Sequence, residues 1–261
     1  AGFSAMLEAG LTFDETPGVV FDYSNLGYSL LGRIITNLSG EPFQGYIASR
    51  ILRPLGMSSS GFRLEDIPQD RVADGHYRRD EKWNVEPWAA TGEFAALGGI
   101  ASSVRDLSLW VATLAGAFPA RDDVDPELPI RRSSLREMQQ GSRFFTAQRG
   151  VDTGSDYVRG ESMSYGFGLV NTVDERFGDI VSHSGGYPGY GSHMCWHPTT
   201  GLGFIGLANG RYASPGRTAA RQALNALLEA VDAPARRVRL TPATRTAQAK
   251  VDALLDSWND E

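Results

Sequence analysis

The chain has 261 residues, of which 41% are hydrophobic and 21% are charged, so it can bury the core of one large domain or two small ones. Its 25 basic and 31 acidic residues are spread along the chain, and this balance argues against a nucleic-acid-binding surface or a polybasic membrane patch. A single cysteine, Cys195, excludes an internal disulfide and a multi-cysteine zinc site, and no apolar run approaches the roughly 20 residues that span a bilayer.

The first strong periodic signal is a helical one. Apolar residues recur at helical spacing over 26–39, and Gly40 supplies a stop, so we predict a helix there. Pro42 opens a second helix, which Pro54 ends. Both helices belong to the first quarter of the chain.

Residues 61–97 mix charge, aromatic side chains and proline without a sustained period. This texture predicts an irregular excursion that could border a cleft. Three aromatic residues within it, Tyr77, Trp83 and Trp88, either anchor the loop to its domain or touch a substrate.

A third helix is predicted to begin at Ser103, where Ser103 and Asp106 form a start that resembles a capping box. A shorter helix is expected around 134–137. The segments 117–132 and 141–162 are polar and interrupted by Gly or Pro, and we predict loops there.

The texture changes after Tyr165, where short β-prone runs alternate with Gly and Pro. This pattern predicts antiparallel strands joined by turns. A helix over 215–231 follows, with a predicted buried stripe of Ala220, Leu224, Leu227, Leu228 and Val231. The tail from Leu240 is expected to be a linker that leads into a short helix near 251–258.

Tyr23 and Asn25 form the first candidate site, directly before the first predicted helix. A helix-opening turn can hold side chains rigidly at the edge of a cleft. There a phenol can relay a proton and an amide can donate to a substrate carbonyl. The alternative is that Tyr23 packs in the core and Asn25 caps the helix.

The run SHSGGYPGYGSH, residues 182–193, is the second candidate. The double glycine, Gly185 and Gly186, lets other groups approach the backbone closely and leaves amides free to face a ligand, as an oxyanion hole requires. His183 would project beside this edge and could donate a hydrogen bond. The alternative is a hairpin that is rich in glycine because it turns tightly.

His193, Cys195 and His197 alternate, so on a strand they would share one face, where two histidines can hold a metal. The three positions span about 13 Å, which is too far for one ion to bind them all. We therefore expect a buried structural thiol here and no metal site. The sequence also contains no H-E-x-x-H and no G-x-S-x-G motif.

Five segments together resemble, in order, the serine β-lactamase-like superfamily, which includes class C β-lactamases, D-alanyl-D-alanine carboxypeptidases and β-lactamase-like esterases. They are YSNLGYSLLGRII, RILRPLGMSSSGF, GGIASSVRDLSLWVATL, SYGFGLV and HSGGYPGYGSHMCWHPTTGLGFIGLAN. The resemblance runs from about Pro17 to about Val231. It implies an α+β fold of the β-lactamase/transpeptidase type, with a mostly antiparallel sheet flanked by helices, a helical subdomain and the N-terminal part missing.

The same resemblance implies a domain organisation. Residues 1–235 would form the β-lactamase-like domain, with its helical part over about 20–140 and its sheet part over about 160–232. Residues 236–261 would form a linker and a short C-terminal helical extension.

The superfamily carries three catalytic elements, namely S-x-x-K, Y-x-N and a K-T-G or H-x-G strand. The likeness implies that Tyr23 takes part in proton transfer with the lysine of the first element and that Asn25 binds the substrate amide. His183 stands where many members have lysine. Ser184 and Gly185 would continue the strand along the substrate. The amide of Gly186 would supply half of the oxyanion hole.

The S-x-x-K element is absent from the sequence. The two lysines are Lys82 and Lys250, and the residues three positions before them are Arg79 and Ala247. In the superfamily this element lies well upstream of Y-x-N, whereas only 22 residues precede Tyr23 here. We expect the chain to be the C-terminal portion of a longer protein, whose missing N-terminal segment supplies the nucleophile and covers apolar surface.

The resemblance implies a serine hydrolase that forms an acyl-enzyme with an amide or ester, such as a D-amino-acid peptide, a β-lactam or a small ester. The chain alone is expected to be inactive. Histidine at 183 favours an esterase or peptidase over a β-lactamase, because histidine is mostly neutral at about pH 7. The expected partners are a small-molecule or peptide substrate and the missing segment, with no cofactor, no nucleic acid and no membrane span in this chain. The alternative is a non-catalytic β-lactamase-like binding or scaffold protein.

Overall fold

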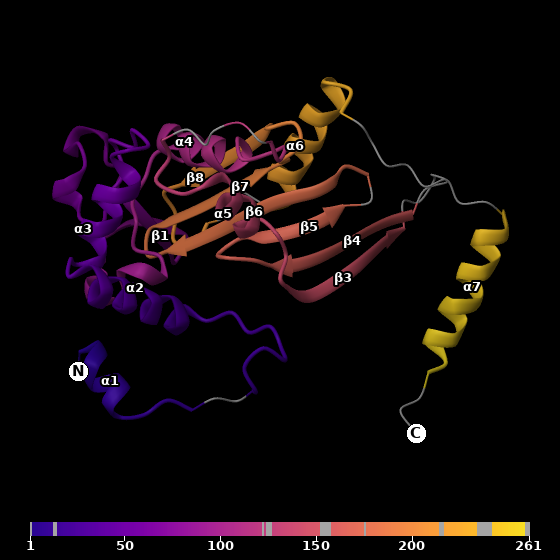
Figure 1. Ribbon diagram of the computed structural model, residues 1–261, viewed down its shortest axis with the longest axis horizontal. Coiled ribbons are helices and arrows are strands. Elements are labelled where there is room, and N and C mark those ends of the chain that lie inside the picture. Colours follow the sequence, from indigo (N-terminus) through magenta and orange to yellow (C-terminus); the bar gives the residue numbers. More distant parts are fainter. Residues whose placement is uncertain are drawn as a thin grey trace.

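The computed structural model describes residues 2–12, 15–121, 123, 127–151, 158–174, 176–213, 217–233 and 242–258. Helices dominate the first half of the chain and an antiparallel sheet dominates the second (Figure 1). Within the described ranges, no helix combines the length and the apolar character that crossing a membrane requires.

The α-helices that precede the main sheet in the chain are α1 (Phe3–Glu8), α2 (Asn25–Ser39), α3 (Phe43–Ile47), α4 (Val104–Ala115) and α5 (Arg132–Met138). The helix predicted over 26–39 is confirmed as α2, which ends at Gly40 in the left-handed conformation with φ of 73°. The helix predicted after Pro42 is confirmed as α3, which continues as a π-helical turn over Ala48–Leu52.

Helix α4 begins as predicted at Ser103, whose hydroxyl accepts the backbone N–H of Asp106 at 3.1 Å. The carboxylate of Asp106 does not complete a capping box by bonding to the backbone of Ser103. It accepts the N–H of Ser59 and the hydroxyl of Ser60, both at 2.7 Å. Asp106 therefore fastens α4 to the segment before the excursion.

The excursion over 61–97 contains more regular structure than predicted. It holds short 3-10 turns and an antiparallel hairpin of β1 (Gly75–Arg79) and β2 (Lys82–Glu86). The two turn residues, Asp80 and Glu81, have positive φ values of 48° and 61°, as a tight hairpin turn requires. Asp-Glu is not one of the glycine-containing pairs that usually mark such a turn, so the sequence carried no hairpin signal.

The main sheet has six strands in chain order, each antiparallel to the next. They are β3 (Arg143–Val151), β4 (Val158–Tyr165), β5 (Val170–Asp174), β6 (Gly178–Tyr187), β7 (Tyr190–Trp196) and β8 (Gly203–Ala208). The loop predicted over 141–162 is wrong, because β3 and the start of β4 occupy much of it. The edge strand β3 has the sequence RFFTAQRGV, which lacks the alternation of apolar and polar residues that is typical of a half-buried strand. Its Phe144 is exposed.

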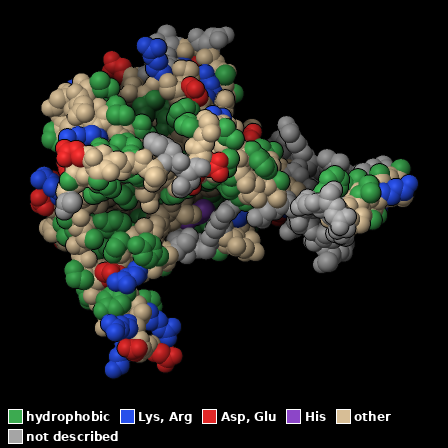
Figure 2. Space-filling model, turned by 90° about the horizontal axis from the view of Figure 1, so that it is seen from below, with side chains coloured by type: hydrophobic (Ala, Val, Ile, Leu, Met, Phe, Trp, Pro, Cys, Tyr) green, Lys and Arg blue, Asp and Glu red, His purple; other side chains and the backbone are tan. Residues whose placement is uncertain are grey.

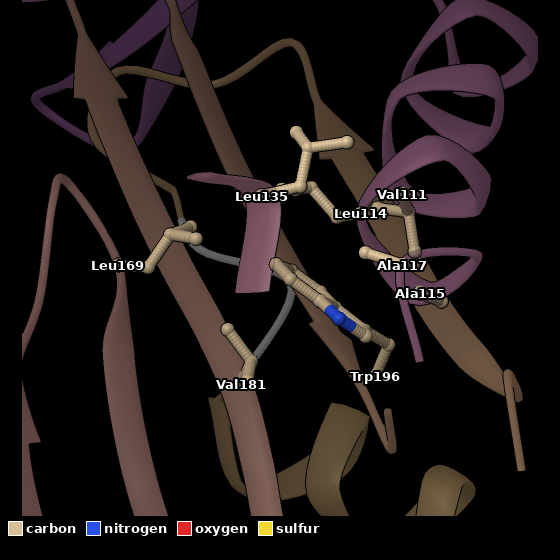
Figure 3. Close-up of a cluster of buried hydrophobic side chains, with 8 residues drawn as sticks. All are labelled: Val111, Leu114, Ala115, Ala117, Leu135, Leu169, Val181 and Trp196. Carbon is tan, nitrogen blue, oxygen red and sulfur yellow. The ribbon is translucent and has the colours of Figure 1, made fainter. Parts of the chain in front are cut away.

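Helices cover both faces of the sheet, and neighbouring residues of β6 show how. Val181 faces a cluster under α4 and α5 that includes Leu114, Leu135 and Trp196 (Figure 3). Ile180 points to the other face and packs with residues of α6 (Arg217–Ala230). The alternation of side chains along a strand therefore divides the core into two layers.

The stripe predicted for α6 is correct in part. Ala220, Leu224 and Leu228 are fully buried, but Leu227 and Val231 are exposed. Only one row of residues spaced by four faces the sheet, because α6 lies on its outer surface. The C-terminal helix α7 (Pro242–Asp256) begins earlier than the short helix predicted near 251–258.

Candidate active site

Tyr23 lies in the extended segment directly before α2, with 53% of its surface exposed. The residue that caps α2 is Ser24, whose hydroxyl accepts the N–H of Gly27 at 2.9 Å. Asn25 is the first residue of the helix and is exposed. The alternative in which Tyr23 packs in the core and Asn25 caps the helix is therefore wrong on both counts.

The end of β6 projects beyond its neighbour β5. The ladder between these strands ends at the pair of Val170 and Ser182, whereas pairing with β7 continues to Tyr187 and Tyr190. Residues 183–187 therefore have strand β7 on one side and other parts of the chain on the side of β5.

Tyr165, the last residue of β4, lies beside this projecting end. Its hydroxyl is 3.0 Å from Nε2 of His183. The ring of Tyr23 lies 6.4 Å from the His183 ring, centre to centre, at an angle of 25°, and 6.0 Å from the ring of Tyr165. The start of α2 and the projecting end of β6 thus meet around three rings.

Tyr28, one turn into α2, adds a third phenol, which is hydrogen-bonded to Tyr165. Burial raises the pKa of Tyr165 well above its usual range, and the nearby Tyr28 and Tyr23 add to this effect. Burial and the nearby Tyr23 also raise the pKa of Tyr28. Both phenols are therefore protonated at neutral pH.

His183 responds to the same environment in the opposite sense. Burial lowers its pKa because it disfavours the charged imidazolium, while a backbone hydrogen bond with Ser184 acts the other way. The imidazole is therefore neutral at about pH 7.

The two glycines of the second candidate lie within β6, and the tight turn of the β6–β7 hairpin falls later, at Gly189 with φ of 82°. Side chains pack against both glycines, on opposite faces of the strand. A Cβ atom on Gly185 would lie 2.5 Å from Oγ of Ser192, and one on Gly186 would lie 2.5 Å from the ring of Tyr212. The predicted hairpin is present, but Gly185 and Gly186 lie in its strand and not in its turn. Close packing, and not the turn, explains the double glycine.

The side chain of Ser184 lies on the face of the sheet opposite to that of His183, because the two residues are consecutive in β6. Its hydroxyl lies 2.7 Å from Nδ1 of the buried His193. Cys195 and His197 are likewise bonded within the protein, through the carbonyl of Ala220 for the thiol and through Thr200 and Phe177 for the imidazole. Within the described ranges, no three His, Cys, Asp or Glu residues are grouped as metal ligands would be.

Two of the three aromatic residues of the excursion anchor it to the rest of the site. Trp88 packs against Tyr187 and Tyr190 at ring distances of 6.1 and 5.9 Å, across the β6–β7 turn. Tyr77 lies under the guanidinium of Arg211 at 4.7 Å. Trp83 is mostly exposed.

Arg211 also pairs with the carboxylate of Glu86 through two nitrogens. The backbone N–H of Arg211 donates to the carbonyl of His76 at 2.7 Å. These contacts join the β1–β2 hairpin to the segment after β8, and so hold it at the turn end of β6.

The structure thus brings the rings of Tyr23 and His183 side by side, and it places Asn25 at the start of α2 and Gly186 on β6 without a described contact between them. Sequence reasoning missed Tyr165 and Tyr28. Tyr165 belongs to the SYGFGLV segment and Tyr28 to the YSNLGYSLLGRII segment, and both segments supported the family resemblance without either tyrosine being assigned a role. The view from below shows hydrophobic side chains gathered over the helical half, with a hollowed surface between them and a histidine inside the hollow (Figure 2).

A family model described as Beta-lactamase matches residues 5–228. The chain belongs to the beta-lactamase family. This match confirms the resemblance to the serine β-lactamase-like superfamily that the five segments indicated.

Relatives within this family are distant. Beta-lactamase-like protein 4 of Dictyostelium discoideum is 27% identical over 197 residues, covering 72% of this chain and 32% of the relative. Unguisins hydrolase ungD of Aspergillus violaceofuscus is 27% identical over 205 residues, covering 76% of this chain and 36% of the relative. The chain therefore spans about a third of the length of these curated relatives.

Solved structures confirm the fold class. The octameric penicillin-binding protein homologue from Pyrococcus abyssi matches with a TM-score of 0.65 at 26% identity, covering 82% of this chain and 44% of that one. A D-stereospecific amidohydrolase from Streptomyces sp. matches with a TM-score of 0.58 at 23% identity, covering 81% of this chain and 56% of that one. The fold is therefore of the β-lactamase/transpeptidase type, as predicted.

Proposed function

We propose that this chain forms the substrate-binding part of a serine hydrolase that acts on an amide or ester through an acyl-enzyme. The observation that carries the proposal is the approach of Tyr23 to His183 at 6.4 Å, since these residues come from the two family motifs present in the sequence. The hydrolase name of the Aspergillus relative supports the same reaction class.

The reaction requires a serine that these 261 residues do not place in an S-x-x-K motif. Its Oγ would attack the substrate carbonyl and form an ester, while the amine or alcohol leaves with a proton. Water would then attack this ester, release the acid and restore the serine. We propose that Tyr23, with the motif lysine, takes the serine proton and passes it to the leaving group.

The remaining site residues would bind the substrate. The amide of Asn25 would hold the carbonyl side of the substrate, and the N–H of Gly186 would stabilise the oxyanion. Ser184 and Gly185 would lie along the substrate as part of the same strand. The bond from His193 to Ser184 and the packing around both glycines keep this strand rigid, which supports such a role.

The candidate substrates are a D-amino-acid peptide, a small ester and a β-lactam. A neutral imidazole at 183 offers no fixed positive charge for a substrate carboxylate. This supports an ester or a peptide over an efficiently hydrolysed β-lactam, because many β-lactams bind through a carboxylate that a lysine would hold more firmly.

We propose that a segment of the same protein outside these 261 residues supplies the serine and the lysine. Exposed apolar side chains on α2 and on the segment before it support this, because monomeric proteins rarely leave such surface uncovered. They are Val19, Val20, Leu31, Ile34 and Leu38, of which Leu38 is 84% exposed. The segment would cover this surface and complete the site.

Labelling with a fluorophosphonate and with a fluorescent penicillin tests the proposal. The protein with its upstream segment should acquire a covalent label on a serine, and the 261-residue chain alone should acquire none. Substituting the labelled serine by alanine should abolish the signal. If the folded protein with its upstream segment takes neither label, the acyl-enzyme proposal is wrong and a non-catalytic binding protein is favoured.

A further inference from the structure

The hydrogen-bonded group formed by Tyr28, Tyr165 and His183 goes beyond the family motifs. We propose that Tyr165 is a positioning residue for His183: its hydroxyl donates to Nε2 and holds the imidazole in one tautomer, facing Tyr23. Its role in catalysis rests on the proposed function, but the hydrogen bond and the tautomer can be tested without any activity.

Strand register explains why His183 needs such a partner. Tyr165, Val170 and Ser182 lie in one row across β4, β5 and β6, because Val170 pairs with both of the others. His183 is the next residue along β6, just past the end of β5. His183 has no pair on β5 in this ladder, and the hydroxyl of Tyr165 lies 3.0 Å from its Nε2 instead.

The phenol of Tyr165 is itself held firmly. Its ring packs 5.2 Å from Phe21 and 6.0 Å from Tyr23, and its hydroxyl is bonded to Tyr28. Phe21 in turn stacks on Phe145 of β3 at 5.0 Å. A ring fixed by Phe21, Tyr23 and Tyr28 can orient the imidazole better than a mobile hydroxyl or water.

The contacts of His183 favour one arrangement of protons. A neutral imidazole has one donor nitrogen and one acceptor nitrogen, and hydrogen-bond partners decide which is which. The backbone bond to Ser184 raises the pKa of the ring, so the ring donates there to a carbonyl, and Nδ1 is the nitrogen left for it. Nε2 is then the acceptor, and the buried Tyr165 hydroxyl, which stays protonated, is the donor.

Tyr165 therefore bonds to His183 and is itself held by Tyr28. The Tyr165 hydroxyl is also hydrogen-bonded to Tyr28, so it is held on the side away from His183 as well. The imidazole is thereby fixed in rotation and in tautomer while its face stays turned to Tyr23 at 25°. The proposed proton transfer at Tyr23 thus takes place beside a fixed, uncharged ring.

Nuclear magnetic resonance of the imidazole nitrogens tests the inference on the 261-residue chain, with His183 assigned by its loss in the His183→Gln variant. The wild-type chain should show His183 as the Nδ1–H tautomer alone. In the Tyr165→Phe variant, which keeps the ring, His183 should become a mixture of both tautomers. Tyr190→Phe is the matched control, because its hydroxyl donates to Ala73 instead, and it should leave His183 unchanged.

The inference is overturned if wild-type His183 is the Nε2–H tautomer or a mixture, or if Tyr165→Phe leaves its signals unchanged. The first of these results needs no variant, so a folding defect in Tyr165→Phe cannot hide it. In the protein with its upstream segment, Tyr165→Phe should lower kcat about 10-fold with little change in KM. The expected tautomer in a protein without hydrolase activity would overturn the proposed function and leave the assignment of His183 standing.

Discussion

The phenol ring of Tyr23 and the imidazole of His183 lie nearly parallel, with their centres 6.4 Å apart, although one precedes α2 and the other lies in β6. Tyr165 closes the group with its hydroxyl 3.0 Å from the imidazole. Two elements distant in sequence therefore form one site, and most of its polar groups are neutral at about pH 7.

Replacing Tyr23 by phenylalanine should abolish catalysis without unfolding the protein. We expect kcat to fall by roughly 10²-fold to 10⁴-fold, the usual range for removing a general acid or base. The melting temperature should stay close to that of the wild type, because Tyr23 is half exposed and Ser24, not Tyr23, caps α2.

The measurement for Tyr23→Phe is steady-state hydrolysis of an activated ester by the protein with its upstream segment. Tyr46→Phe, on α3, is the control and should retain wild-type activity. Full activity in Tyr23→Phe would remove Tyr23 from the proposed mechanism.

Adding a methyl group at Gly186 should disturb the strand that carries the proposed oxyanion amide. In Gly186→Ala the new Cβ would lie 2.5 Å from the ring of Tyr212, so we expect a loss of about 1–3 kcal/mol in the free energy of unfolding. Denaturant titration measures this loss. Tyr212→Ala in the same chain should recover part of it, and a loss that is the same with and without Tyr212 would show that this contact is not the cause.

Gln139 is predicted to be a main polar support of the core. Its amide nitrogen donates to the carbonyls of Leu114 and Leu135, and its oxygen accepts the indole N–H of Trp196 at 2.9 Å. Gln139→Leu would leave these buried groups unpaired and should cost about 3 kcal/mol of unfolding free energy. Gln44→Leu, which removes one exposed bond to Gly92, should cost less than about 1 kcal/mol in the same titration. Equal losses in both variants would contradict the assignment.

Stability should fall as the pH drops below about 6.5. Burial lowers the pKa of both His183 and His197 in the folded chain, so the unfolded chain binds protons first as the pH falls. The free energy of unfolding then decreases until the pH passes the lowered pKa values. Above about pH 6.5 both histidines are neutral in both states, and the stability that they contribute is fully retained.

Urea titrations between about pH 5 and pH 8 measure this dependence. The double variant His183→Gln, His197→Gln should show a flatter profile than the wild type. A profile as steep as that of the wild type would assign the dependence to other groups.

Much of the fold followed from local pattern. The apolar periodicity over 26–39 and after Ser103 predicted α2 and α4, and the Gly-punctuated runs after Tyr165 predicted strands, because these segments bury one face each. The strands β3 and β4 and the β1–β2 hairpin were missed. Backbone pairing and contacts such as that of Glu86 with Arg211 stabilise these strands. Neither requires apolar residues at alternate positions, so the sequence shows little strand pattern there.

The sequence by itself determined the family, the identity of Tyr23, Asn25 and His183 as candidates, and the absence of an S-x-x-K motif, because residue types and short spacings carry that information. Only the tertiary structure decided that Ser24 caps α2, that β6 projects past β5 at Ser182, and that Tyr165 and Tyr28 reach His183. These last relationships depend on strand register and on the packing of distant elements, which no local spacing encodes.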